Sequence, residues 1–207
     1  MNDELIVNSQ HRNRTKEHLK TALIQLIKKK GFHAVSVKDI VDQAGYNRST
    51  FYLHYQDKYV LAEELLIMKL EGLKEATGKP YWHGHKVLTN KLNVESFQIV
   101  DYIYEHRDFF ELIQYDDTLP GLHTGFPQTM LKIYEEQFVF ETINNSPVNM
   151  EYFKYYTAYG FFGLLNNWIL SGFRESRDAF IHNVIELTKT HIHSFHYVGN
   201  KLDPDTK

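Results

Sequence analysis

Apolar residues recur at three- and four-residue spacing along most of the chain, which is the period of an α-helix with one buried face. In the first such segment, residues 15–30, they are Leu19, Ala22, Leu23, Leu26 and Ile27. In a shorter second segment they are Val37, Ile40, Val41 and Ala44. No segment combines sustained apolar–polar alternation with strand-forming residues, so the sequence predicts an all-α fold.

Capping residues mark the ends of the short second helix. Ser36 precedes its apolar run and Asp39 follows three residues later, which approximates a capping box with Asp in place of Glu or Gln. Gly45 can end the helix in the left-handed conformation, and Asn47 can cap the next one. Two short helices joined by a tight turn form a helix-turn-helix, about residues 35–54, whose second helix enters the DNA major groove.

The remaining pattern predicts a larger helical region. A long helix is expected from Asp57 to about Ala76, because the Pro of Thr77-Gly78-Lys79-Pro80 cannot continue it, and a loop should then extend to about Asn90. Further helices are expected near residues 93–106, 107–115, 127–143, 150–172 and 176–197. The sequence thus predicts an N-terminal three-helix domain at residues 12–72, followed by a larger helical dimerisation and effector domain at residues 78–200.

Residues 45–58 carry the most specific motif, which runs GYNRSTFYLHYQDK. It has Gly at the turn, an aromatic region, a His, an aromatic residue, two further residues and a Lys, after an amphipathic helix and Gly31-Phe32. In these features the chain resembles the TetR (tetracycline repressor-like) family of bacterial transcription regulators. The C-terminal segments 107–110 and 165–172 look like a Firmicutes-type subgroup, in which the second domain serves dimerisation or protein partners as readily as ligand sensing.

Composition narrows the function further. The absence of cysteine excludes disulfides and thiolate chemistry, and no signal peptide or membrane span is evident, so a cytoplasmic protein is expected. The net charge is −3, yet residues 1–60 hold ten Lys/Arg against six Asp/Glu, while the rest holds thirteen against twenty. A basic surface on the helix-turn-helix segment suits a partner such as double-stranded DNA.

The start of the second helix is a candidate phosphate site. Ser36 and the backbone amide of Val37 lie at a helix N-terminus, which favours an anion, and in the resembled family this cap touches a DNA phosphate. Lys38 lies on the exposed side of the helix. It is expected to reach the DNA backbone or a base edge, or else to be an ordinary solvated lysine.

The third helix should read the bases. Arg48, Ser49 and Thr50 open it, and N-terminal residues of such a helix usually face the base edges. Arg48 can bind O6 and N7 of guanine or hold a phosphate. Phe51 is expected in the core, whereas exposed Tyr52 can contact a phosphate or a thymine methyl group.

Three further residues match the family's DNA contacts. Leu53 stands where the resembled family often has Tyr or Trp, so only an apolar contact is expected from it. His54 and Lys58 match phosphate-contacting positions of the family. Lys58 would also lie in the first turn of the next helix.

The segment 150–173 carries apolar and aromatic residues nearly all round the predicted helix, so it should be buried on several sides. In the resembled family the last two long helices form a four-helix dimer interface, which predicts a homodimer; the alternative is an ordinary monomer core. The residues assigned to this interface are Tyr159, Gly160, Phe162, Gly163, Trp168, Ile181, Val184, Thr188 and His191. A dimer reads two half-sites about one helical turn apart.

Aromatic residues of the second domain are candidates for an effector pocket, because many members of the resembled family bind a small apolar or aromatic ligand there. They are Phe97, Tyr102, Phe109, Phe126, Tyr134 and Phe138. Aromatic residues at helical spacing more often belong to a core.

Catalytic and metal-binding patterns are missing from the sequence. It has no nucleophile elbow, phosphate-binding glycine loop or His-Glu-x-x-His motif, and its histidine clusters have no cysteine partner. No enzyme activity, cofactor or metal is therefore expected. The sequence predicts a homodimeric regulator that binds a pseudo-palindromic operator as a repressor and is released by an effector. The alternative is an adaptor or coactivator whose C-terminal domain docks a protein partner.

Overall fold

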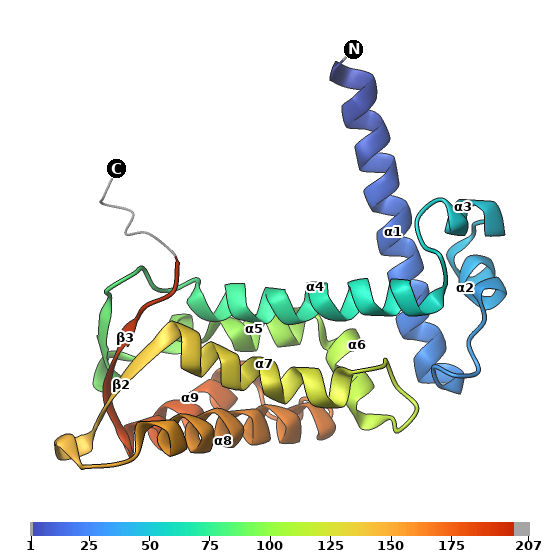
Figure 1. Ribbon diagram of the computed structural model, residues 1–207. Coiled ribbons are helices and arrows are strands. Elements are labelled where there is room, and N and C mark those ends of the chain that lie inside the picture. Colours follow the sequence, from blue (N-terminus) through green and yellow to red (C-terminus); the bar gives the residue numbers. More distant parts are fainter. Residues whose placement is uncertain (1, 201–207) are drawn as a thin grey trace. The chain divides into compact units, whose positions relative to one another are not determined.

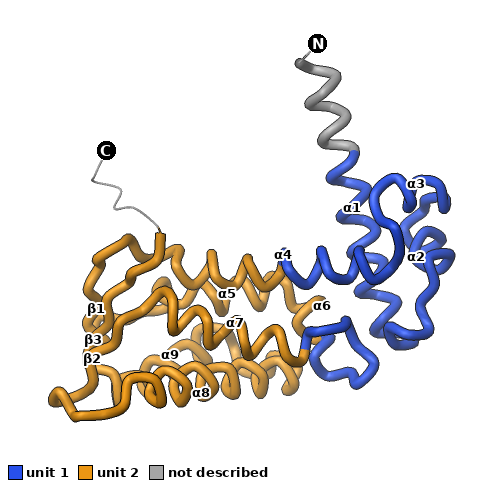
Figure 2. The backbone as a smooth tube through the Cα atoms, viewed as in Figure 1, with its two compact units in different colours: residues 1–68, 112–122 blue, residues 69–111, 123–207 orange. Residues whose placement is uncertain are grey.

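The computed structural model describes the backbone of residues 2–200 and the side chains of residues 12–200. Helices dominate this part of the chain, as predicted, and a small sheet accompanies them (Figure 1). The chain divides into two compact units (Figure 2). Unit 1 comprises Met1–Met68 and Leu112–Leu122, and unit 2 comprises Lys69–Glu111 and His123–Lys207.

Unit 1 contains the predicted helix-turn-helix. Its helices are α1 (Asn2–Lys30), α2 (Val37–Ala44), α3 (Arg48–Tyr52) and the first half of α4 (Lys58–Gly78). The helical spacing of the apolar residues gives each helix one buried face. The fully buried side chains include Leu19, Leu23, Ile27, Phe32, Ile40, Phe51, Leu61 and Leu65.

A segment from later in the chain completes unit 1. Leu112–Leu122 belongs to unit 1, although the chain on both sides of it belongs to unit 2. The amide of Phe32 donates a hydrogen bond to the carbonyl of Asp117 at 3.1 Å. Within the segment, the hydroxyl of Thr118 donates a hydrogen bond to the carbonyl of Leu112 at 2.7 Å. The sequence did not predict this association, because its partners are far apart along the chain.

Unit 2 is a helical domain with short 3₁₀ segments. Its longer elements are the end of α4, α5 (Gln98–Glu105), α6 (Arg107–Phe110), α7 (Leu122–Gln137), α8 (Met150–Leu170) and α9 (Arg177–Lys189). Its 3₁₀ segments are η1 (Thr89–Lys91), η2 (Val94–Phe97) and η4 (Ile143–Asn145), whereas η3 (Glu111–Gln114) begins at the last residue before the segment of unit 1 and lies mostly in that unit. Side chains of α5, α6, α7, α8 and α9 form its core.

The structure contains a three-stranded antiparallel sheet, and two of its strands occupy residues that were predicted to be the ends of helices. The strands are β1 (Lys86–Leu88), β2 (Phe138–Thr142) and β3 (Ile192–Tyr197), in the order β1-β3-β2. The helices predicted over 127–143 and 176–197 therefore end early, and the predicted loop before Asn90 contains a strand. The physical reason is that alternate residues of the strands are buried on one sheet face, with Val87, Phe195 and Phe140 in register.

Candidate DNA-binding interface

The N-terminus of α2 is closed by the predicted capping box. Ser36 Oγ accepts a hydrogen bond from the amide of Asp39 at 3.2 Å, and Asp39 Oδ2 accepts one from the amide of Ser36 at 2.8 Å. Ser36 Oγ also donates to Asp39 Oδ2 at 2.6 Å, and Lys30 Nζ lies 2.9 Å from this oxygen. The hydrogen bonds from Ser36, followed by Lys30, hold the pKa of Asp39 far below its ordinary value. A phosphate contact from Ser36 would therefore require its hydroxyl to turn away from Asp39.

The turn and the cap of α3 also form as predicted. Gly45 has a φ of 74°, the left-handed conformation that ends α2. Asn47 Oδ1 accepts hydrogen bonds from the amide of Thr50 at 2.8 Å, from Ser49 Oγ at 2.6 Å and from Thr50 Oγ1 at 2.9 Å. One side chain thus caps α3 and orients both of its hydroxyl groups.

The outer face of α3 is open. Arg48 and Ser49 are exposed, and Arg48 makes no side-chain hydrogen bond or ion pair within the described part of the chain. Tyr52 is 58% exposed and Leu53 is 76% exposed, whereas Phe51 is fully buried, as predicted. An unpaired guanidinium beside a phenol and an aliphatic group can bind base edges, phosphates or thymine methyl groups.

Lys38 has a local partner. Its Nζ lies 3.3 Å from Asp42 Oδ2, one helical turn further along α2, and both side chains are well exposed. Exposed pairs of this kind contribute little to stability, so Lys38 can exchange Asp42 for another anion at small cost.

Lys58 holds the turn between α1 and α2. Its Nζ donates hydrogen bonds to the carbonyls of Phe32, His33 and Val35, at 3.0, 3.1 and 2.8 Å, and lies 4.6 Å from the centre of the Phe32 ring. Burial lowers the pKa of Lys58. All three ammonium protons are therefore used inside unit 1, and the phosphate contact expected for Lys58 remains a prediction.

Asp117 holds the same turn from another side. The amide of His33 donates to both carboxylate oxygens of Asp117 at 3.2 Å, and His33 Nδ1 lies 2.6 Å from Oδ1. The hydrogen bond with the His33 side chain lowers the pKa of Asp117. Gly31, at φ 76°, lies so close that a Cβ there would overlap this carboxylate. No motif in the sequence indicated this contact.

His54 follows α3 and lies among charged groups of α1 and α4. Burial is the main cause that lowers its pKa, assisted by Lys16 and Arg12 and opposed by Glu64. Lys16 Nζ lies 2.8 Å from Glu64 Oε2. The neutral imidazole therefore dominates at neutral pH, and it can still donate one N–H to a phosphate.

The residues predicted for a dimer interface fall into three groups by their burial within one chain. Trp168, Ile181 and Val184 are no more than 4% exposed, so they belong to the core of unit 2 and their assignment to an interface was wrong. Phe162, Thr188 and His191 are half-buried, whereas Tyr159, Gly160 and Gly163 are exposed on α8. The predicted interface did not include the other exposed aromatic residues of this helix, which are Tyr152, Tyr155 and Tyr156.

The predicted effector residues divide as well. Phe97, Tyr134 and Phe138 line an apolar cavity of about 70 Å³ in unit 2. Phe109 and Phe126 are instead fully buried core residues outside this cavity, which corrects their assignment.

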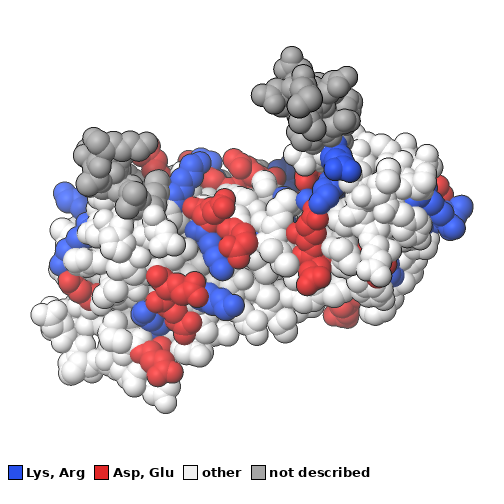
Figure 3. All heavy atoms as spheres, turned by 45° about the horizontal axis from the view of Figure 1, so that its top comes forward, with Lys and Arg blue, Asp and Glu red and all other residues white. Residues whose placement is uncertain are grey.

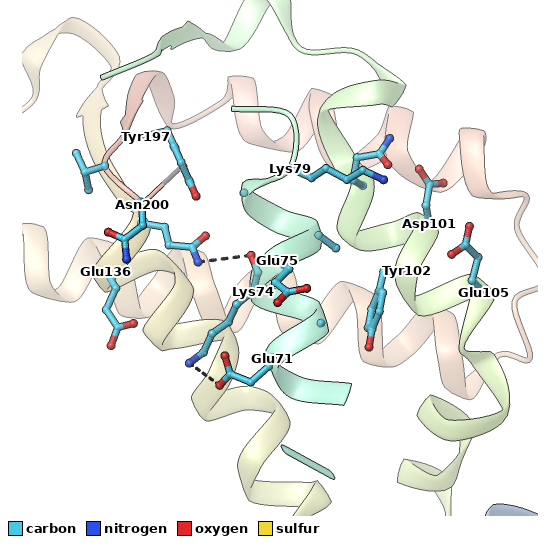
Figure 4. Close-up of a pocket in the computed structure, with 17 residues that line it drawn as sticks. Glu71, Lys74, Glu75, Lys79, Asp101, Tyr102, Glu105, Glu136, Tyr197 and Asn200 are labelled. Carbon is cyan, nitrogen blue, oxygen red and sulfur yellow. Dashed lines mark hydrogen bonds and ion pairs between the residues drawn. The ribbon is translucent and has the colours of Figure 1, made fainter. Parts of the chain in front are cut away.

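Tyr102 lies in a separate, open groove of about 910 Å³ in unit 2 (Figure 4). The groove also contains Asp101 and Glu105 of α5 and Glu71 of α4, which pairs with Lys74 at 3.0 Å. Tyr102 is therefore separated from the other aromatic residues predicted to bind an effector.

The described residues offer neither a metal cluster nor a membrane-spanning helix. Among them, no three His, Asp or Glu side chains come close enough to hold a metal ion. In the same part of the chain, no helix is both long and apolar enough to cross a membrane.

A capped helix-turn-helix with an open second helix, joined to a larger helical unit, defines a DNA-binding regulator of transcription. The comparisons agree. The family model described as "Bacterial regulatory proteins, tetR family" matches residues 20–65, and the one described as "Transcriptional regulator C-terminal region" matches residues 96–190. Together these matches span more than half of the chain, which belongs to the TetR family of transcriptional regulators. These are regulators, not enzymes.

The chain is similar in sequence to curated regulators and in fold to solved structures. The HTH-type transcriptional regulator YxbF of Bacillus subtilis (strain 168) is 23% identical over 172 residues, which cover 82% of this chain and 43% of the relative. The chain spans less than half the length of the curated relatives it matches. The TetR transcriptional regulator of Streptococcus agalactiae 2603V has a similar fold, with a TM-score of 0.58, 19% identity and coverage of 88% and 98%. A TetR-family regulator of Syntrophomonas wolfei str. Goettingen also has a similar fold, with a TM-score of 0.62 and 14% identity. The match covers 86% of this chain and 94% of that one.

Proposed function

We propose that this regulator is a cytoplasmic, homodimeric repressor that binds a pseudo-palindromic operator and releases it when an effector binds unit 2. The observation that carries the proposal is the outer face of α3, where Arg48 is exposed and unpaired at the start of a capped helix. An N-terminal arginine on such a helix can make the bidentate contact to guanine that gives sequence preference.

The proposed DNA surface extends over α2, α3 and the start of α4. Its residues are Ser36, Val37, Lys38, Arg48, Ser49, Thr50, Tyr52, Leu53, His54 and Lys58. Exposed Arg48, Tyr52 and Leu53 support direct contacts. The internal hydrogen bonds of Lys58 support a different contribution, in which it fixes the turn that positions α2.

The exposed face of α8 supports dimerisation. Tyr152, Tyr156 and Tyr159 are 74%, 73% and 43% exposed and recur at three- and four-residue spacing, so they form one aromatic stripe. Further along the helix, Gly160 and Gly163 have open space where a Cβ would stand. Large exposed apolar patches mark interaction sites, and glycines let a second helix approach closely, so we assign this face to a second copy of the chain.

Unit 2 supports an effector only of limited size. The cavity lined by Phe97, Tyr134 and Phe138 measures about 70 Å³, which leaves room for only a few heavy atoms unless the side chains move. An effector reduces DNA binding only if it binds the DNA-incompetent state more tightly. A small apolar molecule that opens this cavity would meet that condition.

Transcription in vitro tests the repressor proposal. A template carries a DNA fragment selected by the protein between the promoter and the start site, and a matched template carries a scrambled fragment. Wild-type protein should lower transcription only from the first template, and Arg48→Ala should not. Unchanged or increased transcription with bound wild-type protein would refute repression.

A further inference from the structure

The N-terminal part of α1 carries an excess of positive charge next to the helix-turn-helix. Residues 12–20 contain four Lys/Arg side chains and a single Glu, and most of this stretch precedes the segment matched by the family model. In Figure 3, blue Lys and Arg side chains lie directly beside the grey N-terminal residues, and red acidic side chains adjoin them. The proposed DNA surface of α2 and α3 does not include any of them.

Two contacts place α1 along both ends of α3. His18 Nδ1 lies 2.9 Å from the hydroxyl of Tyr46, which immediately precedes the cap of α3. Lys16 Nζ lies 5.2 Å from the centre of the Tyr55 ring, which follows α3. The helix α1 therefore passes beside the start and the end of the helix that should read the bases.

Arg12 lies on the same side of α1 as Lys16, and Arg14 on the same side as His18, each about one helical turn nearer the N-terminus. They stand four residues before Lys16 and His18, a distance of about 6 Å along the helix axis. Lys16 is paired with Glu64 at 2.8 Å, and Lys20 approaches the same carboxylate at 3.1 Å. Arg12 and Arg14 are exposed and make no ion pair or side-chain hydrogen bond with another described residue.

We infer that Arg12 and Arg14 bind backbone phosphates of DNA just outside the base pairs that α3 reads. The inference rests on the proposed DNA binding and extends it to a helix that the proposal leaves out. A guanidinium presents paired N–H groups that match a phosphate, and an exposed arginine can reach one without leaving another group unpaired.

The surroundings of His54 agree with this position. Besides burial, the charges of Lys16 and Arg12 lower the pKa of His54, and Glu64 of α4 acts in the opposite direction. Positive charge from α1 thus lies near the end of α3. A DNA phosphate at this place would meet favourable charge.

The test measures how salt weakens DNA binding. The double variant Arg12→Gln/Arg14→Gln is compared with wild type and with Lys91→Gln/Lys132→Gln, a control that removes two exposed charges of unit 2. The probe is a fluorescein-labelled duplex of random sequence and about 30 base pairs, titrated by anisotropy at several salt concentrations. Each lost phosphate contact should reduce the slope of log K against log salt by about 0.9, so the double variant should lose about 1.8 per protomer.

A second duplex defines where the contacts lie. It carries the fragment selected by wild-type protein, either with its natural flanks or trimmed to the recognised base pairs. Trimming should weaken wild-type binding and should leave the affinity of the arginine variant almost unchanged.

The outcomes separate this inference from the proposed function. If wild type binds and the arginine variant has the same salt slope as the lysine control, the inference is wrong and the proposed function stands. A change of base preference in the flanks without a change of slope would also overturn the phosphate assignment. Absence of DNA binding by wild type would overturn both. Circular dichroism melts confirm that the exposed substitutions leave the fold intact.

Discussion

Removing the ammonium of Lys58 should destabilise unit 1 even in the absence of DNA. Lys58→Met keeps a stem of similar length against the Phe32 ring and removes only the charged donor. The carbonyls of Phe32, His33 and Val35 then lose their shared partner, which lies within 3.1 Å of each of them. The turn that leads into α2 would become less fixed.

The expected loss follows from these three hydrogen bonds. A hydrogen bond to a charged group contributes about 1.5–3 kcal/mol. The three bonds share one ammonium, and water can replace part of each at this half-buried site, so their contributions do not add fully. The free energy of unfolding should therefore fall by about 2–4 kcal/mol. For a chain of this size, this corresponds to a decrease in Tm of about 4–16 °C.

Urea unfolding at one fixed protein concentration measures this loss, because association would otherwise shift the transition. Lys38→Met is the matched control, since Lys38 is exposed and pairs only with Asp42, and it should cost less than about 0.5 kcal/mol. If Lys58→Met is as stable as the control, the internal role of Lys58 is wrong. A lower salt slope of DNA binding with unchanged stability would show that its ammonium binds phosphate instead.

The other predictions concern base reading, assembly and pH. Arg48→Ala should cost about 1–3 kcal/mol per half-site and relax preference at one base pair of each, so an unchanged selected motif would exclude base reading by Arg48. Gly163→Asp faces open space within one chain and should fold, yet it would bury an unpaired charge between two copies. Light scattering should show a wild-type dimer and a mostly monomeric variant at micromolar concentration; a dimeric variant would contradict the assigned face. Hydrogen bonds from Lys86 and Ser194 lower the pKa of Glu141 from 4.5 to about 2. Because the folded-state pKa is depressed, this stabilisation is present above about pH 4.5 and is lost as pH falls towards 2. The difference in urea midpoint between wild type and Glu141→Gln should therefore shrink over that range. A constant difference would contradict a stabilising role of the ionised Glu141 carboxylate.

Local rules account for what the sequence predicted correctly. Ser36, Gly45 and Asn47 act within a few residues of themselves, so their capping and turn geometry follows from the residue types. The buried position of Phe51 likewise follows from helical periodicity. These features locate α2 and α3 without knowledge of the rest of the chain.

Long-range contacts account for what it missed. The sheet joins residues far apart in sequence, such as Lys86 and Glu141, and β2 follows α7 at Phe138 with no Gly or Pro between them. Phe138 and Phe195 also stand four residues after Tyr134 and His191, so the first part of β2 and the end of β3 fit a continuation of the helical spacing that precedes them, and periodicity alone could not separate the two structures. The contact of Asp117 with His33 depends on the same kind of distant pairing.

The interface residues show the same limit. Trp168 and Val184 resemble interface positions in the sequence because they are apolar residues on the last two long helices. Their burial depends on how α8 and α9 pack within one chain, where Trp168 stacks on Phe180 with ring centres 4.6 Å apart. The sequence pattern could not distinguish a side chain buried within the chain from one buried between two copies.

The most direct test of the central claim is selection of bound fragments from a pool of random double-stranded DNA, with sequencing after several rounds. If α3 reads bases in a dimer, the wild-type protein should enrich an inverted repeat whose half-sites are about one helical turn apart. Parallel selection with Arg48→Ala should lose the preference at one base pair of each half-site. A wild-type pool that remains as random as the starting DNA would contradict the assignment of α3 as a sequence-reading helix.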